Sequence, residues 1–278
     1  MKKVIAAVDA FNFTEQELRS YKYLAEKARG ELTILFLENI LGESVVFANA
    51  NAESGYFDYD SLFGEEIRAR GLKAEANKQK LKDFYRDNGM DVVVRELTGA
   101  PAAETIAESQ FADLLLIRNT TSFAVLRDSN PPRFVRDLLA DAHCPVMIIP
   151  ENVHYIREIV FSYNGSLSSS YAIRQFTLLF GELSETPVKV VYVVENDEKR
   201  IPKGKLLKEY LNHHYEEVSY ESFTGTPSAE LMGLLLHAKN SVVTFGAYGR
   251  SRTSRFFHRS DADSLLRIGN VPVFITHP

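Results

Sequence analysis

The sequence predicts an α/β protein made of two tandem, doubly wound parallel sheets, and three observations support this. Apolar, β-branched runs alternate with helical stretches, as in parallel strands joined by right-handed crossovers. The same series of segments occurs twice along the chain. The chain has 278 residues, 45% of them hydrophobic, which is enough for two domains of ordinary size. We expect one domain at residues 1–150 and the other at 156–278.

The first half contains the elements of one complete domain. Val4–Val8 is a continuous apolar run, as expected for a strand buried on both faces. Thr14 and Glu17 form a capping box before an amphipathic helix, and Gly30 is expected at its C′ position. The remaining strands are expected at Leu32–Leu37, Val92–Leu97, Leu114–Ile117 and Val146–Ile149.

Two further stretches complete the first half. Asn39–Asp60 has no clear period and is interpreted as a long loop, in which Tyr56–Tyr59 suggest a lid or a contact surface. Ser61–Asn88 is charged and helical, and Gly89 is expected to close it. Pro101 is expected near the first position of the next helix.

The second half repeats the first in the same order. TGAPAAE and TGTPSAE share five of seven residues, at Thr98–Glu104 and Thr224–Glu230. The other matched pairs are Val4–Asp9 with Ile159–Asn164, Phe36–Asn39 with Val193–Asn196, and Cys144–Ile148 with Val271–Ile275. Such matches indicate two copies of one domain, joined near Glu151–Tyr155. In the second copy, the short segment Lys203–Asn212 stands where the first has its insertion and long helix, and the third strand follows near Glu217–Phe223.

The stretch Val242–Ser260 carries the main functional signal. An apolar run breaks at Gly246 and turns at Gly249, and a loop rich in arginine then leads to Ser260, where a second capping box with Asp263 starts a helix. Glycines, free helical N–H groups and arginines are how α/β proteins hold a phosphate. No Gly-Lys-Ser/Thr follows, so this is not a Walker loop. An ordinary loop with solvated arginines is the alternative.

These residues resemble the universal stress protein family in its tandem form, and the resemblance covers both halves. Nucleotide-binding members carry Gly-x2-Gly-x9-Gly-Ser/Thr after the fourth strand. Gly246, Gly249 and Ser260 match three of the four positions, and Arg259 stands in place of the third glycine. Arg259 either blocks backbone approach or binds phosphate through its guanidinium.

The resemblance also implies a binding crevice. In the Rossmann-like sheet with flavodoxin-like order, ligands lie at the carboxyl ends of strands one and four. In the second half these ends are Asn164-Gly165-Ser166 and Gly246–Gly249. The position beside the ribose is Asp9 in the first half and Asn164 in the second, and the backbone position beside the adenine falls at Leu37 and Val193.

The first half departs from the family pattern. Arg118 and Thr121 stand where the two glycines belong, and Pro131-Pro132 replace Gly-Ser. Because proline has no backbone N–H, two donors are missing where a phosphate would bind. We interpret the nucleotide motif of the first half as lost and that of the second as partly kept.

The resemblance implies that the two copies form a pseudo-dimer. Their fifth strands, Val146–Ile149 and Val271–Thr276, would otherwise be apolar sheet edges, which proteins seldom leave open. We expect these strands to pair antiparallel. A homodimer of the whole chain stays open.

Other chemically active residues have simpler explanations. His143 and Cys144 are neighbours in an extended segment, so their side chains should point to opposite faces and form no catalytic dyad. His213 and His214 are expected to be solvated. Asp261 and Asp263 are a candidate Mg²⁺ contact or simply complement a helix dipole. We therefore assign no catalytic residue and no metal ligand.

Composition excludes several classes of protein. A net charge of −5 disfavours a general nucleic-acid binder. The single cysteine allows no intrachain disulfide, and no apolar run has the length of a signal peptide core or membrane span. We expect a cytoplasmic protein with no membrane partner.

Three functions remain. The first is a stress-response regulator that binds ATP or another adenine nucleotide, with Mg²⁺, in its second half without fast turnover. The second is a degenerate scaffold that binds no nucleotide and acts through an unknown protein partner. The third is an ATP-hydrolysing enzyme, against which stands the lack of a convincing general base or metal cluster.

Overall fold

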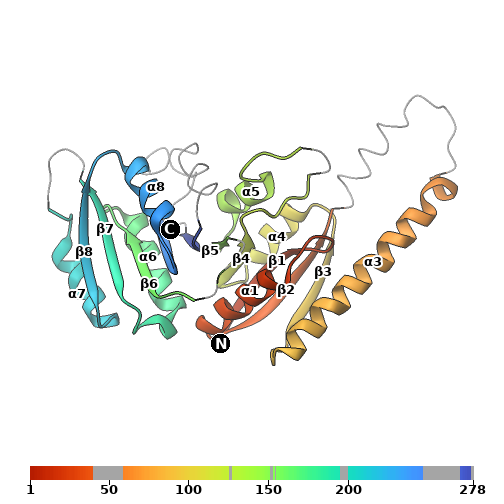
Figure 1. Ribbon diagram of the computed structural model, residues 1–278, viewed down its shortest axis with the longest axis horizontal. Coiled ribbons are helices and arrows are strands. Elements are labelled where there is room, and N and C mark those ends of the chain that lie inside the picture. Colours follow the sequence, from red (N-terminus) through yellow and green to blue (C-terminus); the bar gives the residue numbers. More distant parts are fainter. Residues whose placement is uncertain are drawn as a thin grey trace.

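The computed structural model describes residues 1–39, 59–124, 127–150, 153, 155–194, 200–246 and 270–276, with residues 59–64, 66 and 67 described by backbone alone. Within these residues, ten strands form one sheet in the order β3-β2-β1-β4-β5-β10-β9-β6-β7-β8 (Figure 1). The strands are β1 Lys2–Asp9, β2 Gly30–Glu38, β3 Val93–Thr98, β4 Leu114–Arg118, β5 Val146–Ile149, β6 Glu158–Ser162, β7 Val188–Val194, β8 Val218–Thr224, β9 Ser241–Gly246 and β10 Val273–Thr276. The α/β fold class expected from the sequence is confirmed.

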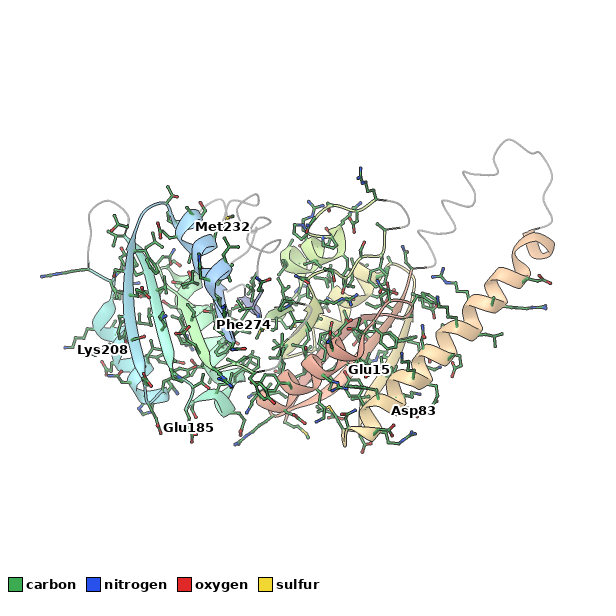
Figure 2. All side chains as sticks on the ribbon, viewed as in Figure 1. Glu15, Asp83, Glu185, Lys208, Met232 and Phe274 are labelled. Atoms are coloured by element: carbon green, nitrogen blue, oxygen red, sulfur yellow. The ribbon has the colours of Figure 1, made fainter. Side chains whose placement is uncertain are left out.

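The two groups of five strands meet at one antiparallel pair. Every other neighbouring pair in the sheet is parallel, whereas β5 and β10 run antiparallel with Met147 opposite Phe274. Phe274 lies at this seam (Figure 2) and packs against Phe176 and Phe180, with ring centroids 5.3 and 6.2 Å apart. The expected pairing of the fifth strands is confirmed, and it leaves neither apolar edge exposed.

Helices cover both faces of the sheet, and each face has its own apolar core. The helices are α1 Glu15–Lys27, α3 Tyr59–Asp87, α4 Pro101–Ser109, α5 Arg133–Asp141, α6 Leu167–Leu179, α7 Gly204–His214 and α8 Pro227–His237. Buried side chains of α1, α3, α6 and α7 join the core on one face, and those of α5 and α8, with partly buried ones of α4, join the core on the other. Alternate residues of each strand feed the two cores: Val4 and Ala6 enter one, and Ile5 and Ala7 the other.

Polar contacts reinforce the seam on the α1 and α6 side. Lys2 Nζ donates to the carbonyl oxygens of Ala28 and Leu179, at 3.1 and 2.7 Å, just at the C-terminal ends of α1 and α6. An ammonium group is favourable there because helix C-termini carry partial negative charge. Arg29 forms an ion pair with Glu182 beside it. The two halves of the chain are thus held together by charge as well as by the sheet.

The expectation for Gly30 was wrong. Arg29, with φ of 50°, takes the left-handed position after α1, and Gly30 is already the first residue of β2. A Cβ on Gly30 would overlap the side chain of Val4 on β1. This glycine is required by the close approach of two strands and not by helix termination.

The other elements fall within a few residues of their expected bounds. Of the interpreted loop Asn39–Asp60, residues 40–58 lie outside the described part, and α3 begins at Tyr59. Gly89 ends this segment with φ of +70°, and Pro101 opens α4, both as expected. In the described residues no helix combines the length and apolarity needed to span a bilayer.

Candidate functional site

In a doubly wound sheet, ligands bind at the carboxyl ends of neighbouring strands where the strand order reverses; here these two places are the ends of β1 and β4 and the ends of β6 and β9, which we call the first and second crevice. Strand register relates their residues: Leu114 on β4 pairs with Val4, and Val242 on β9 pairs with Ile159. Arg118 lies four residues after Leu114, and Gly246 lies four residues after Val242. Arg118 and Gly246 therefore occupy the same position in the two halves. The two crevices therefore differ at this point by a guanidinium side chain.

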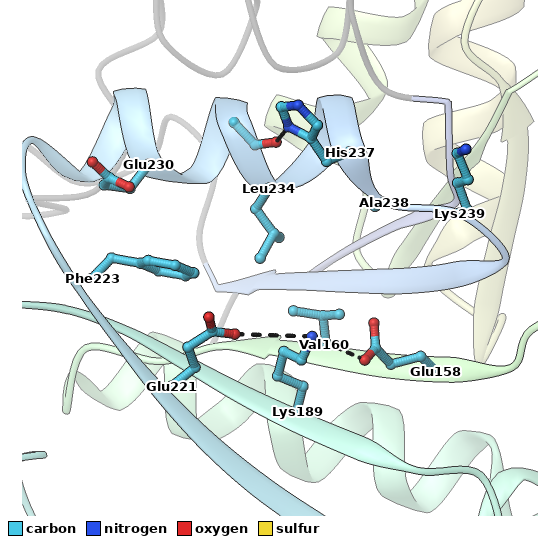
Figure 3. Close-up of a pocket in the computed structure, with 11 residues that line it drawn as sticks. Glu158, Val160, Lys189, Glu221, Phe223, Glu230, Leu234, His237, Ala238 and Lys239 are labelled. Atoms are coloured by element: carbon cyan, nitrogen blue, oxygen red, sulfur yellow. Dashed lines mark hydrogen bonds and ion pairs between the residues drawn. The ribbon is translucent and has the colours of Figure 1, made fainter.

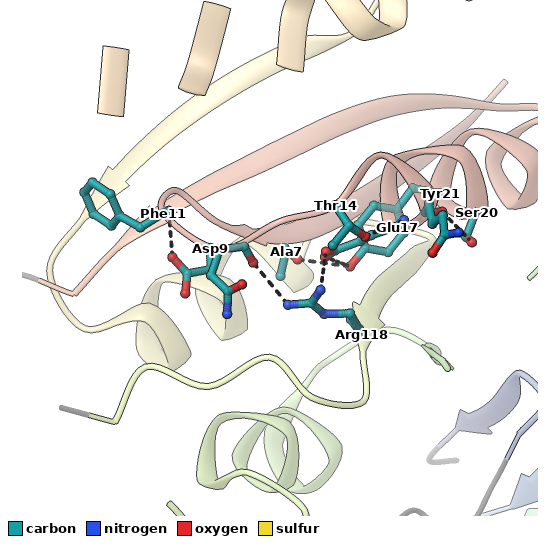
Figure 4. Close-up of polar contacts among 10 residues, drawn as sticks. Ala7, Asp9, Phe11, Thr14, Glu17, Ser20, Tyr21 and Arg118 are labelled. Atoms are coloured by element: carbon teal, nitrogen blue, oxygen red, sulfur yellow. Dashed lines mark hydrogen bonds and ion pairs between the residues drawn. The ribbon is translucent and has the colours of Figure 1, made fainter. Parts of the chain in front are cut away.

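In the first half, Arg118 fills the crevice (Figure 4). Its side chain is 8% exposed; Nη1 lies 3.2 Å from Glu17 Oε2, and Nη2 donates to the Asn12 carbonyl oxygen at 3.1 Å. Arg118 thus ties the end of β4 to the loop after β1 and to the first turn of α1. A ligand entering here would have to displace it.

Glu17 is buried more deeply than its partner, at 1% side-chain exposure. Burial raises the pKa of this carboxyl, while the guanidinium of Arg118 and a hydrogen bond from Tyr21 oppose the rise. The Tyr21 hydroxyl lies 2.9 Å from Glu17 Oε1. Thr14 also caps α1 by accepting from the Glu17 N–H at 3.2 Å, so the expected capping residue is confirmed.

A carboxylate supplied by the chain occupies the start of α5. Asp128 Oδ1 accepts from the backbone N–H of Ser129 at 2.7 Å and of Arg133 at 3.2 Å. Burial alone would raise the pKa of Asp128, but hydrogen bonds from Ser122, Arg133 and Ser129 outweigh it and lower the pKa. The first half thus carries its own anion where helix N–H groups point outward, directly after Pro131 and Pro132.

Two amide side chains donate hydrogen bonds to backbone carbonyl oxygens around the first crevice. Asn77 on α3 donates to the Ala10 carbonyl oxygen at 2.8 Å, and Asn39 donates to that of Phe123 at 2.7 Å. Asp9, the expected ribose partner, accepts from the Phe11 N–H at 2.9 Å. Burial raises the pKa of Asp9, and hydrogen bonding by Phe11 opposes this. These groups are engaged with the chain itself, whereas Arg118 Nε and Thr121 Oγ1 are buried without a hydrogen-bond partner among the described residues.

In the second half, the turn after β6 brings three of the expected site residues together. Asn164 Oδ1 accepts from the Ser166 N–H at 3.0 Å, as Asp9 does in the first half. Ser166 is the N-cap of α6 and accepts from the Ser169 N–H at 3.1 Å. Gly165 has φ of +77°, and a Cβ there would meet the Pro202 ring. Only Gly165 separates Asn164 from the N-cap Ser166, whereas residues 10–13 separate Asp9 from Thr14, the N-cap of α1. The turn after β6 is therefore tighter than the turn after β1.

Gly246 ends β9 against the first turn of α6. A Cβ on Gly246 would overlap the carbonyl group of Ser168 and approach the Ser169 nitrogen. The glycine is therefore needed by the packing of α6 on the sheet, whether or not a ligand binds. Val193 is buried near the end of β7, as expected for a residue whose backbone alone would meet a ligand. Gly249, Arg259 and Ser260 lie outside the described residues, as do Asp261 and Asp263.

The structure also identifies a partner that sequence reasoning missed. Arg118 is recognised from the sequence as a departure from the glycine pattern, but its buried partner Glu17 is not. The available signal was Glu17 itself, which precedes Leu18 and stands one turn before Tyr21 on the apolar stripe of α1. A carboxylate beside such a stripe indicates a buried cation nearby.

Cys144 has no nucleophile chemistry in this fold. Its side chain is buried and His143 is exposed, which confirms that the two point apart. Burial raises the pKa of the Cys144 thiol to about 12. We expect the folded protein to react with a thiol reagent such as iodoacetamide far more slowly than the urea-unfolded chain, because the thiolate is the reactive form. Mass spectrometry follows the labelling of the folded and unfolded chain, and equal rates in the two states would contradict this expectation.

Two further expectations concern the histidines of α7 and a metal site. His213 and His214 are its last two residues, and burial together with the neighbouring His213 lowers the pKa of His214. In the part of the chain that the structure describes, no group of three or more His, Cys, Asp or Glu side chains is placed to hold a metal ion.

The chain has an α/β fold that is similar to that of universal stress proteins. The chain is 22% identical over 289 residues to Universal stress protein Slr1230 of Synechocystis sp., across 98% of this chain and 99% of that protein. This match confirms the family resemblance read from the sequence. No protein-family model matches the chain.

Solved structures agree on the fold. A universal stress protein from Archaeoglobus fulgidus is similar with a TM-score of 0.70 and 16% identity, covering 98% of each chain. A putative universal stress protein from Pseudomonas aeruginosa has a TM-score of 0.54 and 13% identity, covering all of this chain and 94% of its own. At these identities the likeness concerns the fold alone.

Proposed function

We propose that this chain is a stress-response regulator that binds one adenine nucleotide, in its second half, without fast turnover. The family resemblance implies the stress-response role. The observation that carries the rest is the contrast at one sheet position, where the first half places Arg118 and the second half Gly246. Residues 1–150 then form a domain without a nucleotide site, and residues 156–278 form the binding domain.

Three features support the assignment to the second half. The first crevice is filled by Arg118, and the start of its α5 helix is satisfied by Asp128. The second half keeps three of the four motif positions. At the turn after β6, the Oδ1 atom of Asn164 and the Oγ atom of Ser166 bond within the turn, so the neutral group proposed for a ribose is the side-chain N–H of Asn164.

The described residues fit only part of a nucleotide. They supply the ribose side, but the open sides of Gly165 and Gly246 face Pro202 and Ser168 and form no phosphate cradle. Phosphate binding is therefore assigned to the segment that contains Gly249 and Ser260, with Mg²⁺ accompanying ATP, and Arg259 in this segment either binds the phosphate or blocks backbone approach. Slow turnover follows from the absence of an assigned general base.

The stoichiometry tests this proposal. We expect ATP or ADP titration in a calorimeter to give no more than one equivalent per chain, and mass spectrometry of protein purified without added nucleotide to find an adenine nucleotide. Substituting Gly249→Val should abolish binding, whereas Thr121→Val, at the corresponding first-half position, should leave it unchanged. Two equivalent sites would contradict the assignment to the second half.

One observation favours a second candidate, a scaffold that binds no nucleotide. Gly246 is explained fully by its contact with Ser168, so its presence requires no ligand. The ribose position has also changed from a carboxylate in the first half to Asn164. Protein that is purified empty and gives no heat with ATP or ADP would support this candidate against the first.

A further inference from the structure

A cleft of about 500 Å³ lies between α8 and the face of β6, β7 and β8 (Figure 3). Its floor is formed by strand residues such as Glu158, Lys189 and Glu221, and its roof by the last turns of α8. Glu158 is the first residue of β6, whereas the nucleotide crevice lies beyond the last residue of that strand. The cleft is therefore separate from the proposed nucleotide site.

The floor is a row of charges across three strands. Lys189 Nζ lies 3.1 Å from Glu158 Oε1 and 3.9 Å from Glu221 Oε2. The three side chains are between 33% and 47% exposed, so solutes can reach them. One ammonium group has three N–H donors, whereas two carboxylates offer more acceptor sites than that. The floor thus has an excess of negative charge and of acceptors.

The rest of the cleft is apolar except for Glu230, His237 and Lys239. Leu234 points from α8 toward the charged row, and Val160 and Phe223 line the sheet side (Figure 3). His237 Nδ1 lies 2.7 Å from the Gly233 carbonyl oxygen of its own helix. Lys239, just beyond α8, lines one end and is exposed. An occupant needs positive charge on one side and an aliphatic body on the other.

The first half shows how the same place is filled when the helix supplies the charge. There Glu108 on α4 pairs with Arg95 on β3 and, at 3.9 Å, with Lys3 on β1. The matched segments Thr98–Glu104 and Thr224–Glu230 bring Glu108 into register with Leu234. By the same match Arg95 corresponds to Glu221, and by the match of Val4–Asp9 with Ile159–Asn164 Lys3 corresponds to Glu158. In the second half the flanking strand charges are reversed, and α8 presents a leucine to them.

We propose that this cleft binds a linear aliphatic diamine or polyamine. Its ammonium groups contact Glu158 and Glu221, and its methylene chain packs against Leu234. Because one lysine reaches both carboxylates, they are close enough together for one such molecule to contact both. Lys189 supplies one positive charge to the two carboxylates, and the ligand supplies further positive charge from the side of α8.

Calorimetric titration with putrescine and spermidine at low salt tests the proposal, with 1,4-butanediol as the neutral probe of similar length. We expect both amines to bind and the diol not to bind. The double variant Glu158→Gln/Glu221→Gln should weaken amine binding by about tenfold or more. Glu108→Gln, which changes the matched place in the first half, should leave the affinity unchanged.

A second variant distinguishes the cleft from general charge attraction. Leu234→Lys gives α8 its own ammonium group over the two carboxylates, so it should abolish amine binding and leave the melting temperature equal or higher. Thermal melting of every variant verifies folding. Absence of amine binding by the wild type, or full affinity in the double glutamine or the Leu234→Lys variant, overturns the proposal. Nucleotide titration of the same variants should be unchanged, so the two sites are tested independently.

Discussion

Replacing Arg118 by alanine is expected to lower the free energy of unfolding by about 3–5 kcal/mol, the cost of leaving a buried charge without its partner. Glu17, 1% exposed, would keep only its hydrogen bond from Tyr21 and its contacts with the first turn of α1. The Asn12 carbonyl oxygen would also lose its donor. Urea unfolding followed by circular dichroism measures the change.

Three matched variants identify the cause. Arg19→Ala removes an exposed partner of Glu15, and we expect it to cost less than about 0.5 kcal/mol. Glu17→Gln should cost less than Arg118→Ala, because burial raises the pKa of Glu17 and already disfavours its ionised form. The double variant Glu17→Gln/Arg118→Met should recover part of the stability that the single variant Arg118→Met loses. An Arg118→Ala variant as stable as Arg19→Ala would show that the buried ion pair does not stabilise the first half.

The regular elements could be predicted because their signals are local. Val4–Val8 and Val146–Ile149 are apolar runs bounded by turn residues, and the latter matches β5 residue for residue. The antiparallel contact of β5 with β10 followed from a simple physical demand, that apolar edges be covered. Internal similarity supplied the remaining order of the strands.

The contents of the crevices could not be predicted in the same way. Whether Arg118 is solvated or buried depends on the loop after β1, where residues 10–13 separate Asp9 from the N-cap Thr14 of α1. In the second half Gly165 alone separates Asn164 from the N-cap Ser166, and α6 lies against Gly246. Loop length and side-chain volume thus act together, and neither one reveals the outcome.

Glycine positions show the same limit. Gly30 and Gly246 are each next to a helix or turn in the sequence, so helix termination and phosphate approach were reasonable interpretations. In the fold, both are required by the close packing of the chain on itself. These roles can be distinguished only from the distance between each glycine and the neighbouring backbone or side-chain atoms.

Substituting Gly246→Ala is therefore expected to destabilise the protein by about 1–3 kcal/mol, the usual cost of overpacking a filled site. The added methyl group would overlap the Ser168 carbonyl group, which belongs to the backbone at the start of α6 and cannot rotate away. Relief requires moving the whole helix, whose buried Phe176 packs on Phe274 at the seam. Urea unfolding again measures the effect.

Gly233→Ala provides the matched control, since it adds the same methyl group to a glycine in the middle of α8. Among the described residues outside its own helix turn, none lies within 4 Å of a Cβ built there, so this variant should gain about 0.5–1 kcal/mol from helix propensity. The opposite signs of the two changes test the packing argument directly. If Gly246→Ala were as stable as the wild type, α6 would not lie against β9 as described, and the glycine would be left to serve a ligand. A stable Gly246→Ala variant that lost nucleotide binding would then favour the regulator over the scaffold.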